Sequence, residues 1–202
     1  DRPALLRQQL RALVMAAKGR PLQVMFPMVA EVSELDRARS LLDRELQAAQ
    51  RRGEQTPEQI RVGAMVEVPA LAWQLDALFE RADFLSLGTN DFFQFFFASD
   101  RSNPQMTERY DVLSPPPLRF LAELARRCGR ANIPLTVCGE IAGQPLEALA
   151  LLALGYRRLS MAPPSLGPVK AMIRTTDLRH AAEFVTARIA KTEASLRSSL
   201  RD

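Results

Sequence analysis

The sequence predicts an α/β fold made of about five strand–helix units, with parallel strands in one sheet. Three observations predict it. Short apolar runs alternate with longer helical patterns, each apolar run is followed by a helix of its own, and no internal repeat or linker-like change of composition interrupts the pattern. The chain has 202 residues, 47% of them hydrophobic and 25% charged, which is enough to bury a core. We therefore expect one domain over residues 1–202.

The first quarter of the chain contains two expected helices and one expected strand. A helix over residues 3–19 ends at Gly19, because glycine readily takes the left-handed conformation that closes a helix. An apolar strand follows over residues 22–28. A charged helix then spans residues 32–52, with Ser33 as its N-cap, since the hydroxyl can accept a hydrogen bond from a free backbone amide.

The middle of the chain contains two further apolar strands. The strand over residues 61–68 is followed by Pro69, a residue suited to the first turn of a helix, so a helix is expected over residues 70–81. The strand over residues 83–88 runs into Gly-Thr-Asn-Asp and a short apolar helix.

The last part of the chain alternates in the same way. Three prolines at 115–117 open a helix over residues 118–129, because proline is tolerated in a first turn. The remaining expected elements are a strand over 134–138, a helix over 145–154, a strand over 158–161, a short helix over 166–173 and a long amphipathic helix over 177–200.

Composition excludes several classes of protein. No apolar run approaches the roughly 18–20 residues of a membrane span, and no secretory signal opens the chain. The formal charge is +4, and nearly all 27 basic residues are arginines scattered without interleaved aromatic residues, which argues against nucleic-acid binding. Cys128 and Cys138 do not form a disulfide framework, so the cytoplasm is the expected compartment.

The segment from Gly88 to Arg101 carries the strongest functional signal. It delivers Asn90 and Asp91 at the end of an apolar strand, the edge where ligands bind in α/β barrels and open sheets. Arg101 follows ten residues after Asp91. A carboxylate for a divalent cation and a guanidinium for phosphate suggest a Mg²⁺-assisted phosphoryl compound. For a lone Asn-Asp pair, an Asx turn with a solvated arginine would be an equally good interpretation.

Two other strands also end in residues with reactive side chains, a carboxylate and a thiol. Glu67 is the single carboxylate at the end of an apolar strand, and its alternative role is a salt bridge to an arginine on a neighbouring strand. Cys138 ends the strand over residues 134–138. An ordinary thiol has a pKa of about 8.5 and can donate a proton at neutral pH, although a free cysteine is often only a small buried apolar residue.

The strand ends carry five motifs: Met-Phe-Pro-Met at 25–28, Gly-Ala-Met-Val-Glu-Val-Pro at 63–69, Gly-Thr-Asn-Asp at 88–91, Cys-Gly-Glu at 138–140 and Ser-Met-Ala-Pro-Pro at 160–164. Taken in order, these motifs resemble the phosphoenolpyruvate-binding C-terminal barrel of enzyme I of the bacterial phosphotransferase system. The resemblance runs from about Arg2 to at least Arg174, and Ser165–Ile173 is most similar to the nitrogen-regulatory paralogue. It implies the C-terminal part of a TIM (β/α)₈ barrel whose N-terminal strands lie upstream of Asp1.

The resemblance also implies roles for the strand-end residues. Glu67 and Asp91 are expected to bind Mg²⁺, and Asn90, Asp91 and Arg101 to bind phosphoenolpyruvate. Cys138 is expected to protonate the enolate of pyruvate after the phosphoryl group has left. In this family the phosphoryl acceptor is a histidine on a separate domain, and two more phosphate-binding arginines lie upstream. The fragment alone should therefore be inactive, and His180 is expected to be an ordinary helix-surface residue.

Partners and alternatives follow from the same resemblance. Enzyme I dimerises through this domain and passes its phosphoryl group to an HPr-like phosphocarrier protein through its N-terminal domain, in sugar transport or in nitrogen regulation. Phe92-Phe93 departs from the family pattern, and some of the five phenylalanines between residues 92 and 97 are expected to face a partner. The alternatives are a pyruvate phosphate dikinase or phosphoenolpyruvate synthase, a non-catalytic phosphoenolpyruvate-binding dimerisation module, and a Mg²⁺-enolate aldolase or lyase.

Overall fold

A computed structural model describes residues 3–100, 102–103, 110–191 and 194–200 of the chain. Its centre is a parallel sheet of four strands whose spatial order is their order in the sequence. This arrangement confirms the predicted α/β class. The strands are β1 (Leu22–Phe26), β2 (Ile60–Val66), β3 (Phe84–Gly88) and β4 (Leu135–Cys138).

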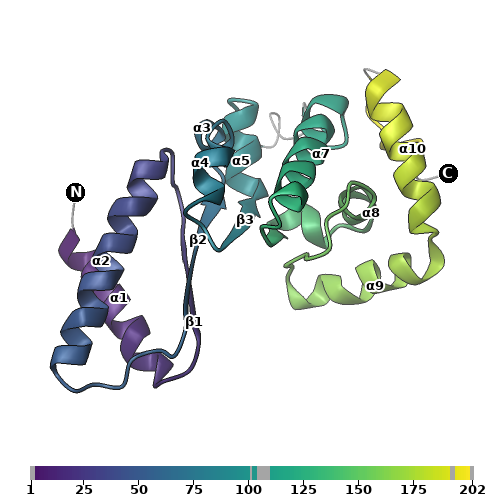
Figure 1. Ribbon diagram of the computed structural model, residues 1–202. Coiled ribbons are helices and arrows are strands. Elements are labelled where there is room, and N and C mark those ends of the chain that lie inside the picture. Colours follow the sequence, from purple (N-terminus) through teal and green to yellow (C-terminus); the bar gives the residue numbers. More distant parts are fainter. Residues whose placement is uncertain (1–2, 101, 104–109, 192–193, 201–202) are drawn as a thin grey trace.

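Helices join and cover the strands (Figure 1). In Figure 1, α1 and α2 lie side by side at one end of the molecule, and α9 and α10 lie at the other end. The helices are α1 (Pro3–Ala17), α2 (Val32–Arg51), α3 (Pro69–Ala72), α4 (Leu75–Phe79), α5 (Thr89–Phe96), α7 (Pro115–Arg130), α8 (Pro145–Ala153), α9 (Leu166–Thr175) and α10 (Leu178–Lys191), with short 3₁₀ turns η1 (Glu140–Gly143) and η2 (Pro163–Ser165).

The two faces of the sheet differ in how well they are covered. Residues such as Val62, Leu85 and Val137 point to one face and are at most 1% exposed, because the helices pack on that side. Their strand neighbours on the other face, such as Met65 and Thr136, are only half-buried and line an open cavity of about 370 Å³. Right-handed crossovers between neighbouring parallel strands place the connecting helices on one face of a sheet, which accounts for the uncovered face.

The phenylalanines after β3 belong mainly to the core. Phe92 is 1% exposed and its ring stacks on that of Phe120, with a centroid separation of 4.2 Å. Phe93 is 7% exposed, whereas Phe95 is 43% exposed. The Phe92 ring therefore packs between α5 and α7, and of these three rings only that of Phe95 projects into solvent.

The prediction of a fifth strand over residues 158–161 is wrong, because these residues, all of which the structure describes, form no strand. Leu159 forms only an isolated bridge with Val137. Two backbone hydrogen bonds hold this bridge, from the Val137 amide to Arg158 O and from the Ser160 amide to Val137 O. The chain then reaches two prolines at 163–164, which have no amide hydrogen and cannot extend a ladder.

Two other expected elements also differ. The helix over residues 70–81 is broken into α3 and α4, because the Gln74 side chain donates to Ala30 O at 3.0 Å and accepts from the Val32 amide at 3.2 Å. The helix over 177–200 ends as α10 at Lys191.

The N-cap of α2 is Glu31, so the assignment of Ser33 was wrong. Ser33 lies inside the first turn of the helix. Glu34 does the capping instead, because its Oε2 accepts from the amides of Ala30 at 2.8 Å and Glu31 at 3.1 Å. These two hydrogen bonds lower the pKa of the Glu34 carboxyl group below 4.5.

A buried carboxylate joins α1 to α2. Glu45 is 1% exposed and accepts from Arg7 Nε at 2.6 Å and from Arg11 Nε at 3.1 Å. The hydrogen bond from Arg7 is the main cause that lowers the pKa of Glu45 below 4.5, against the opposing effect of burial. The two arginine side chains are about half exposed, at 49% and 50%, so this network is intermediate between a surface and a buried ion pair.

Glu45→Ala should lower the free energy of unfolding at pH 7 by about 1–3 kcal/mol, measured by urea denaturation. Since the folded-state pKa of Glu45 is lowered, its contribution is complete above the ordinary value of 4.5 and is lost as the pH falls through the folded-state value. The difference between wild type and variant should therefore shrink below pH 4.5. Asp43→Ala, at an exposed position of the same helix, is the control. An equal difference at pH 7 and pH 3 would contradict this account.

Candidate active site

The functional residues gather at the carboxyl edge of the sheet. Glu67 follows β2, Asn90 and Asp91 lie in the first turn of α5 directly after β3, and Cys138 is the last residue of β4. Gly88 and Cys138 are register partners on neighbouring strands. Because the strands are parallel, their carboxyl ends meet at one edge, where ligands bind in such folds.

Glu67 is held deep in this edge. It is 3% exposed, and its Oε1 accepts a hydrogen bond from the Met28 amide at 2.6 Å. Its Oε2 lies so close to the backbone of the next strand that a Cβ on Gly88 would stand 2.6 Å from it. The glycine at position 88 therefore makes room for the carboxylate.

No positive charge balances Glu67 within the described residues. Neither a lysine nor an arginine of that part of the chain lies within ion-pair distance of it, so the alternative of a salt bridge to a strand arginine is not observed there. Buried carboxylates are normally paired or bound to a cation. Glu67 is therefore a buried carboxylate that could bind a cation.

Asn90 ties the start of α5 to the loop that follows Cys138. Its Oδ1 accepts from the Glu140 amide at 3.0 Å. Next to it, Thr89 Oγ1 donates to Cys138 O at 2.9 Å. Gly139 has a φ of +114°, and a Cβ there would stand 2.2 Å from Thr89 Oγ1, so only glycine fits between them.

Asn90 lies in an α-helix and has no positive φ. Among the described residues its Nδ2 group donates to no acceptor, and the side chain lines a cavity of about 530 Å³ with Ser160 and Ser165. The amide oxygen is thus used structurally, and the amide hydrogens remain for a ligand.

Cys138 faces the uncovered side of the sheet. It is half-buried and lines the open 370 Å³ cavity together with Ser86 and Ser160. The thiol donates to Leu87 O at 3.4 Å and accepts from Ser86 Oγ at 3.3 Å. These contacts fix the orientation of the thiol, whose proton points at Leu87 O.

Ser86 is a site residue that the sequence analysis missed. It is 6% exposed in the middle of the apolar strand β3, and its hydroxyl hydrogen points to Cys138 Sγ. A hydroxyl donor stabilises a thiolate once the thiol has lost its proton. The signal was a lone polar residue within Phe-Leu-Ser-Leu, at the position that alternation assigns to the uncovered face.

The two carboxylates expected to bind Mg²⁺ lie at the ends of adjacent strands. Asp91 is half-buried in the first turn of α5, where the helix dipole favours a negative charge. The described residues contain no group of three or more histidine, cysteine, aspartate or glutamate side chains placed to hold a metal. Two carboxylates completed by water and substrate oxygens nevertheless suit Mg²⁺, which retains several waters.

Arg101 and His180 are the other residues with an expectation from the sequence. Arg101 lies outside the described residues. His180 is exposed on α10, away from the carboxyl edge of the sheet, as predicted for a helix-surface residue.

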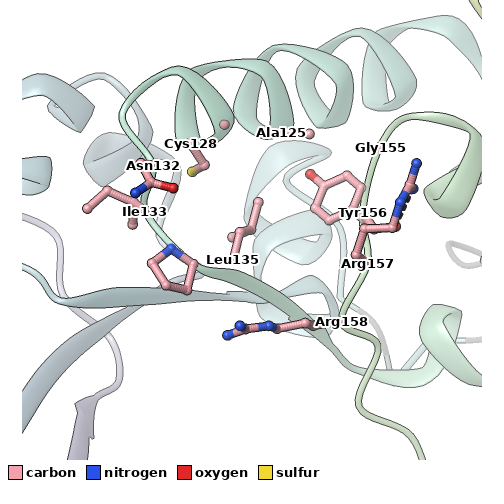
Figure 2. A pocket seen from close by; sticks show the side chains of 11 residues that line it. Ala125, Cys128, Asn132, Ile133, Leu135, Gly155, Tyr156, Arg157 and Arg158 are labelled. Carbon is pink, nitrogen blue, oxygen red and sulfur yellow. Dashed lines mark hydrogen bonds between the residues drawn. The ribbon is translucent and has the colours of Figure 1, made fainter.

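Cys128 lies elsewhere, beside a cavity of about 280 Å³ near the start of β4 (Figure 2). It is 1% exposed on α7, and burial raises the pKa of its thiol to about 12. In the same cavity the Tyr156 hydroxyl donates to Leu121 O at 2.9 Å. Cys128 therefore stays protonated and inert at neutral pH, in contrast to the accessible Cys138.

The sequence matches a known family and several known proteins. The model of the family described as PEP-utilising enzyme, PEP-binding domain, matches residues 1–178. A phosphoenolpyruvate-protein phosphotransferase of Cupriavidus necator is 38% identical over 85% of this chain and 29% of its own length. A phosphoenolpyruvate-dependent phosphotransferase system protein of Escherichia coli is 37% identical over 100% of this chain and 27% of its own.

A multiphosphoryl transfer protein of Xanthomonas campestris is 41% identical over 86% of this chain and 20% of its own length. The chain thus spans less than a third of each of these three relatives. Among solved structures, a citrate lyase from Burkholderia xenovorans has a similar fold, with a TM-score of 0.58 and 19% identity over 96% of this chain and 65% of that one. None of the described helices is both long and apolar enough to cross a membrane.

Proposed function

The chain belongs to the family of phosphoenolpyruvate-utilising enzymes, in their phosphoenolpyruvate-binding domain, and we propose that it is the substrate-binding part of a phosphoenolpyruvate-protein phosphotransferase. The observation that carries the proposal is that three groups meet at one sheet edge: the buried Glu67 carboxylate, the Asn90 amide and the Cys138 thiol. Within the described residues, no cation pairs with Glu67 and no acceptor takes the amide hydrogens of Asn90. The relatives named as phosphotransferases support it.

Glu67 and Asp91 would hold Mg²⁺, which when bound neutralises charge on the phosphate. The Asn90 amide hydrogens would bind the phosphate or carboxylate of the substrate, and Arg101 would pair with the phosphate through two parallel hydrogen bonds. These groups orient the phosphoryl group toward a histidine on another domain, where a P–N bond forms as the bond to the enolate oxygen breaks.

Cys138 would act on the other product. The electron pair of the broken P–O bond stays on the oxygen, which gives the enolate of pyruvate. The methylene carbon of this enolate then takes the thiol proton from Cys138. The Ser86 hydroxyl donates to the sulfur and would stabilise the resulting thiolate until solvent returns a proton. Because the acceptor histidine and two further phosphate-binding arginines are expected outside residues 1–202, this segment alone would be inactive.

We also propose that the sheet is an arc of a (β/α)₈ barrel and that residues 1–202 form part of that single domain. The strand order and the uncovered face support this, since a barrel buries that face against the remaining strands. The cytoplasm is the proposed compartment, because Cys128 and Cys138 are both free thiols. An HPr-like phosphocarrier protein is the proposed recipient of the phosphoryl group.

We propose a homodimer through the surface around Trp73. This side chain is 89% exposed beside an apolar cavity of about 270 Å³ that includes Phe96 and Phe120. An exposed tryptophan next to such a hollow is typical of an interface. Trp73→Ser should shift the full-length protein toward the monomer in sedimentation equilibrium, whereas Phe95→Ser, an exposed ring outside the hollow, should not. A dimer of unchanged strength in Trp73→Ser would exclude this surface.

The function is tested on the full-length protein. Phosphoenolpyruvate should bind in calorimetry only with Mg²⁺ present, and mixing should yield pyruvate and a phosphorylated histidine without any nucleotide. A requirement for nucleotide would favour a dikinase or synthase, and binding without turnover would favour a non-catalytic module. Cleavage of a carbon–carbon bond would favour an aldolase or lyase. No binding would overturn the assignment.

A further inference from the structure

Thr89 joins the ends of β3 and β4 through its side chain. It is the first residue of α5, directly after Gly88, and it is 1% exposed. Its Oγ1 donates a hydrogen bond to Cys138 O at 2.9 Å. The hydroxyl hydrogen is therefore committed to the backbone of Cys138 and is not available to a ligand.

This hydrogen bond extends the pairing of β3 with β4 to the very end of β4. The Leu85 amide donates to Pro134 O at 2.8 Å, and parallel pairing continues from there in even steps along both strands. The same steps lead to Thr89 on one side and to Cys138 O on the other. Because α5 begins at Thr89, the hydroxyl of this residue makes the last link.

Gly139 fits closely against the same hydroxyl. Its φ of +114° turns the chain directly after Cys138, and a Cβ there would stand 2.2 Å from Thr89 Oγ1 and 2.8 Å from Asn90 Oδ1. Asn90 Oδ1 in turn accepts from the Glu140 amide at 3.0 Å. Residues 138–140 are thus held by two adjacent side chains in the first turn of α5.

The backbone held in this way carries the thiol. Cys138 Sγ contacts Ser86 Oγ at 3.3 Å and Leu87 O at 3.4 Å, both on β3. A thiol forms only weak hydrogen bonds, so these two contacts do not hold the side chain firmly by themselves. The direction of the Cα–Cβ bond depends on the backbone, and Thr89 holds that backbone at its carbonyl oxygen.

We propose that Thr89 is a positioning residue for protonation of the enolate, because its hydroxyl holds the backbone of Cys138 and so sets the place of the thiol at the open cavity. This inference rests on the proposed function. Thr89 acts on the reaction only through Cys138. Its loss should therefore slow pyruvate formation and leave phosphoenolpyruvate affinity unchanged.

The test measures single-turnover pyruvate formation and phosphoenolpyruvate affinity in full-length variants at saturating Mg²⁺. Thr89→Val keeps the shape of the side chain but lacks the donor. It should slow pyruvate formation by about 10–100-fold, since a misplacement of about 1 Å can cost that much. Thr89→Ser keeps the hydroxyl and should retain most of the wild-type rate. Thr175→Val removes an exposed hydroxyl on α9 that also donates to backbone carbonyls, and it should change nothing.

Three outcomes would overturn the proposal. In a Cys138→Ala background Thr89→Val should cause no further slowing, so an equal additional loss there would show that Thr89 does not act through the thiol. A fall in phosphoenolpyruvate affinity at an unchanged rate would assign Thr89 to the support of Asn90 instead. Equal slowing by Thr89→Ser and Thr89→Val would show that the hydroxyl is not the group that matters.

Hydrogen exchange gives a second readout that needs no substrate. Peptides covering residues 138–142 should exchange faster in Thr89→Val while peptides from β1 and β2 stay unchanged. Unchanged exchange over 138–142 would overturn the link between Thr89 and Cys138, and faster exchange in every peptide would assign Thr89 to global stability. Failure of the wild type to form pyruvate would count against the proposed function, while the exchange data would still decide whether Thr89 holds the end of β4.

Discussion

Cys138→Ala in the full-length protein should slow pyruvate formation by roughly 10²–10⁴-fold while changing phosphoenolpyruvate affinity less than about twofold. The reason is geometric. The thiol lines the open cavity and makes its hydrogen bonds to Leu87 O and Ser86 Oγ, so its loss removes a proton donor and leaves the proposed phosphate contacts intact. Single-turnover kinetics that follow pyruvate formation measure the effect, since the enolate in the variant must take its proton from solvent.

Two controls sharpen this prediction. Cys128→Ala removes the other thiol, which burial keeps protonated with a pKa of about 12, and it should leave the turnover rate unchanged. Of these two thiols, a maleimide at pH 7.5 should modify Cys138 alone, and turnover should fall in the same proportion as Cys138 is modified. Full turnover by Cys138→Ala would show that another group protonates the enolate.

Glu67→Gln should remove the Mg²⁺ dependence of phosphoenolpyruvate binding and weaken binding at saturating Mg²⁺ by about a hundredfold or more. Glutamine keeps the shape of the side chain and can still accept from the Met28 amide, so the fold should be preserved. What it removes is the negative charge, which no described basic residue neutralises. Titration of phosphoenolpyruvate with and without Mg²⁺, together with thermal unfolding, measures both effects.

The matched control is Glu183→Gln, at an exposed position on α10. It should bind phosphoenolpyruvate as the wild type does. If Glu67→Gln instead raised the thermal stability and kept Mg²⁺-dependent binding, Glu67 would be a buried structural carboxylate, and the metal would have to be held elsewhere.

Much of the fold could be predicted because it depends on local patterns. The alternation of apolar runs with helical segments identified all four strands, and the strand ends placed Glu67 and Cys138 at the same edge as Asn90. The carboxyl ends of parallel strands must lie at the same edge of the sheet, so residues at these ends come together whatever the loops do. The chemistry of each strand end could therefore be assigned before any distance was known.

The errors arose where a contact from a distant part of the chain outweighed the local signal. Gln74 breaks a predicted helix because it hydrogen-bonds to Ala30, 44 residues away. Ser33 has the right chemistry for an N-cap, but Glu34 reaches the free amides first.

The sequence by itself determined the α/β class, the strand order along the chain and the residues offered at the sheet edge, since these follow from periodicity and from the residue type at each strand end. Only the tertiary structure decided that Ser86 points at Cys138 and that Arg197 joins Asp111 to Glu147. Those contacts span 50 to 86 residues of chain. Packing of whole helices against the sheet brings such residues within hydrogen-bond distance. A pattern in a short window of sequence cannot predict which distant residues will meet.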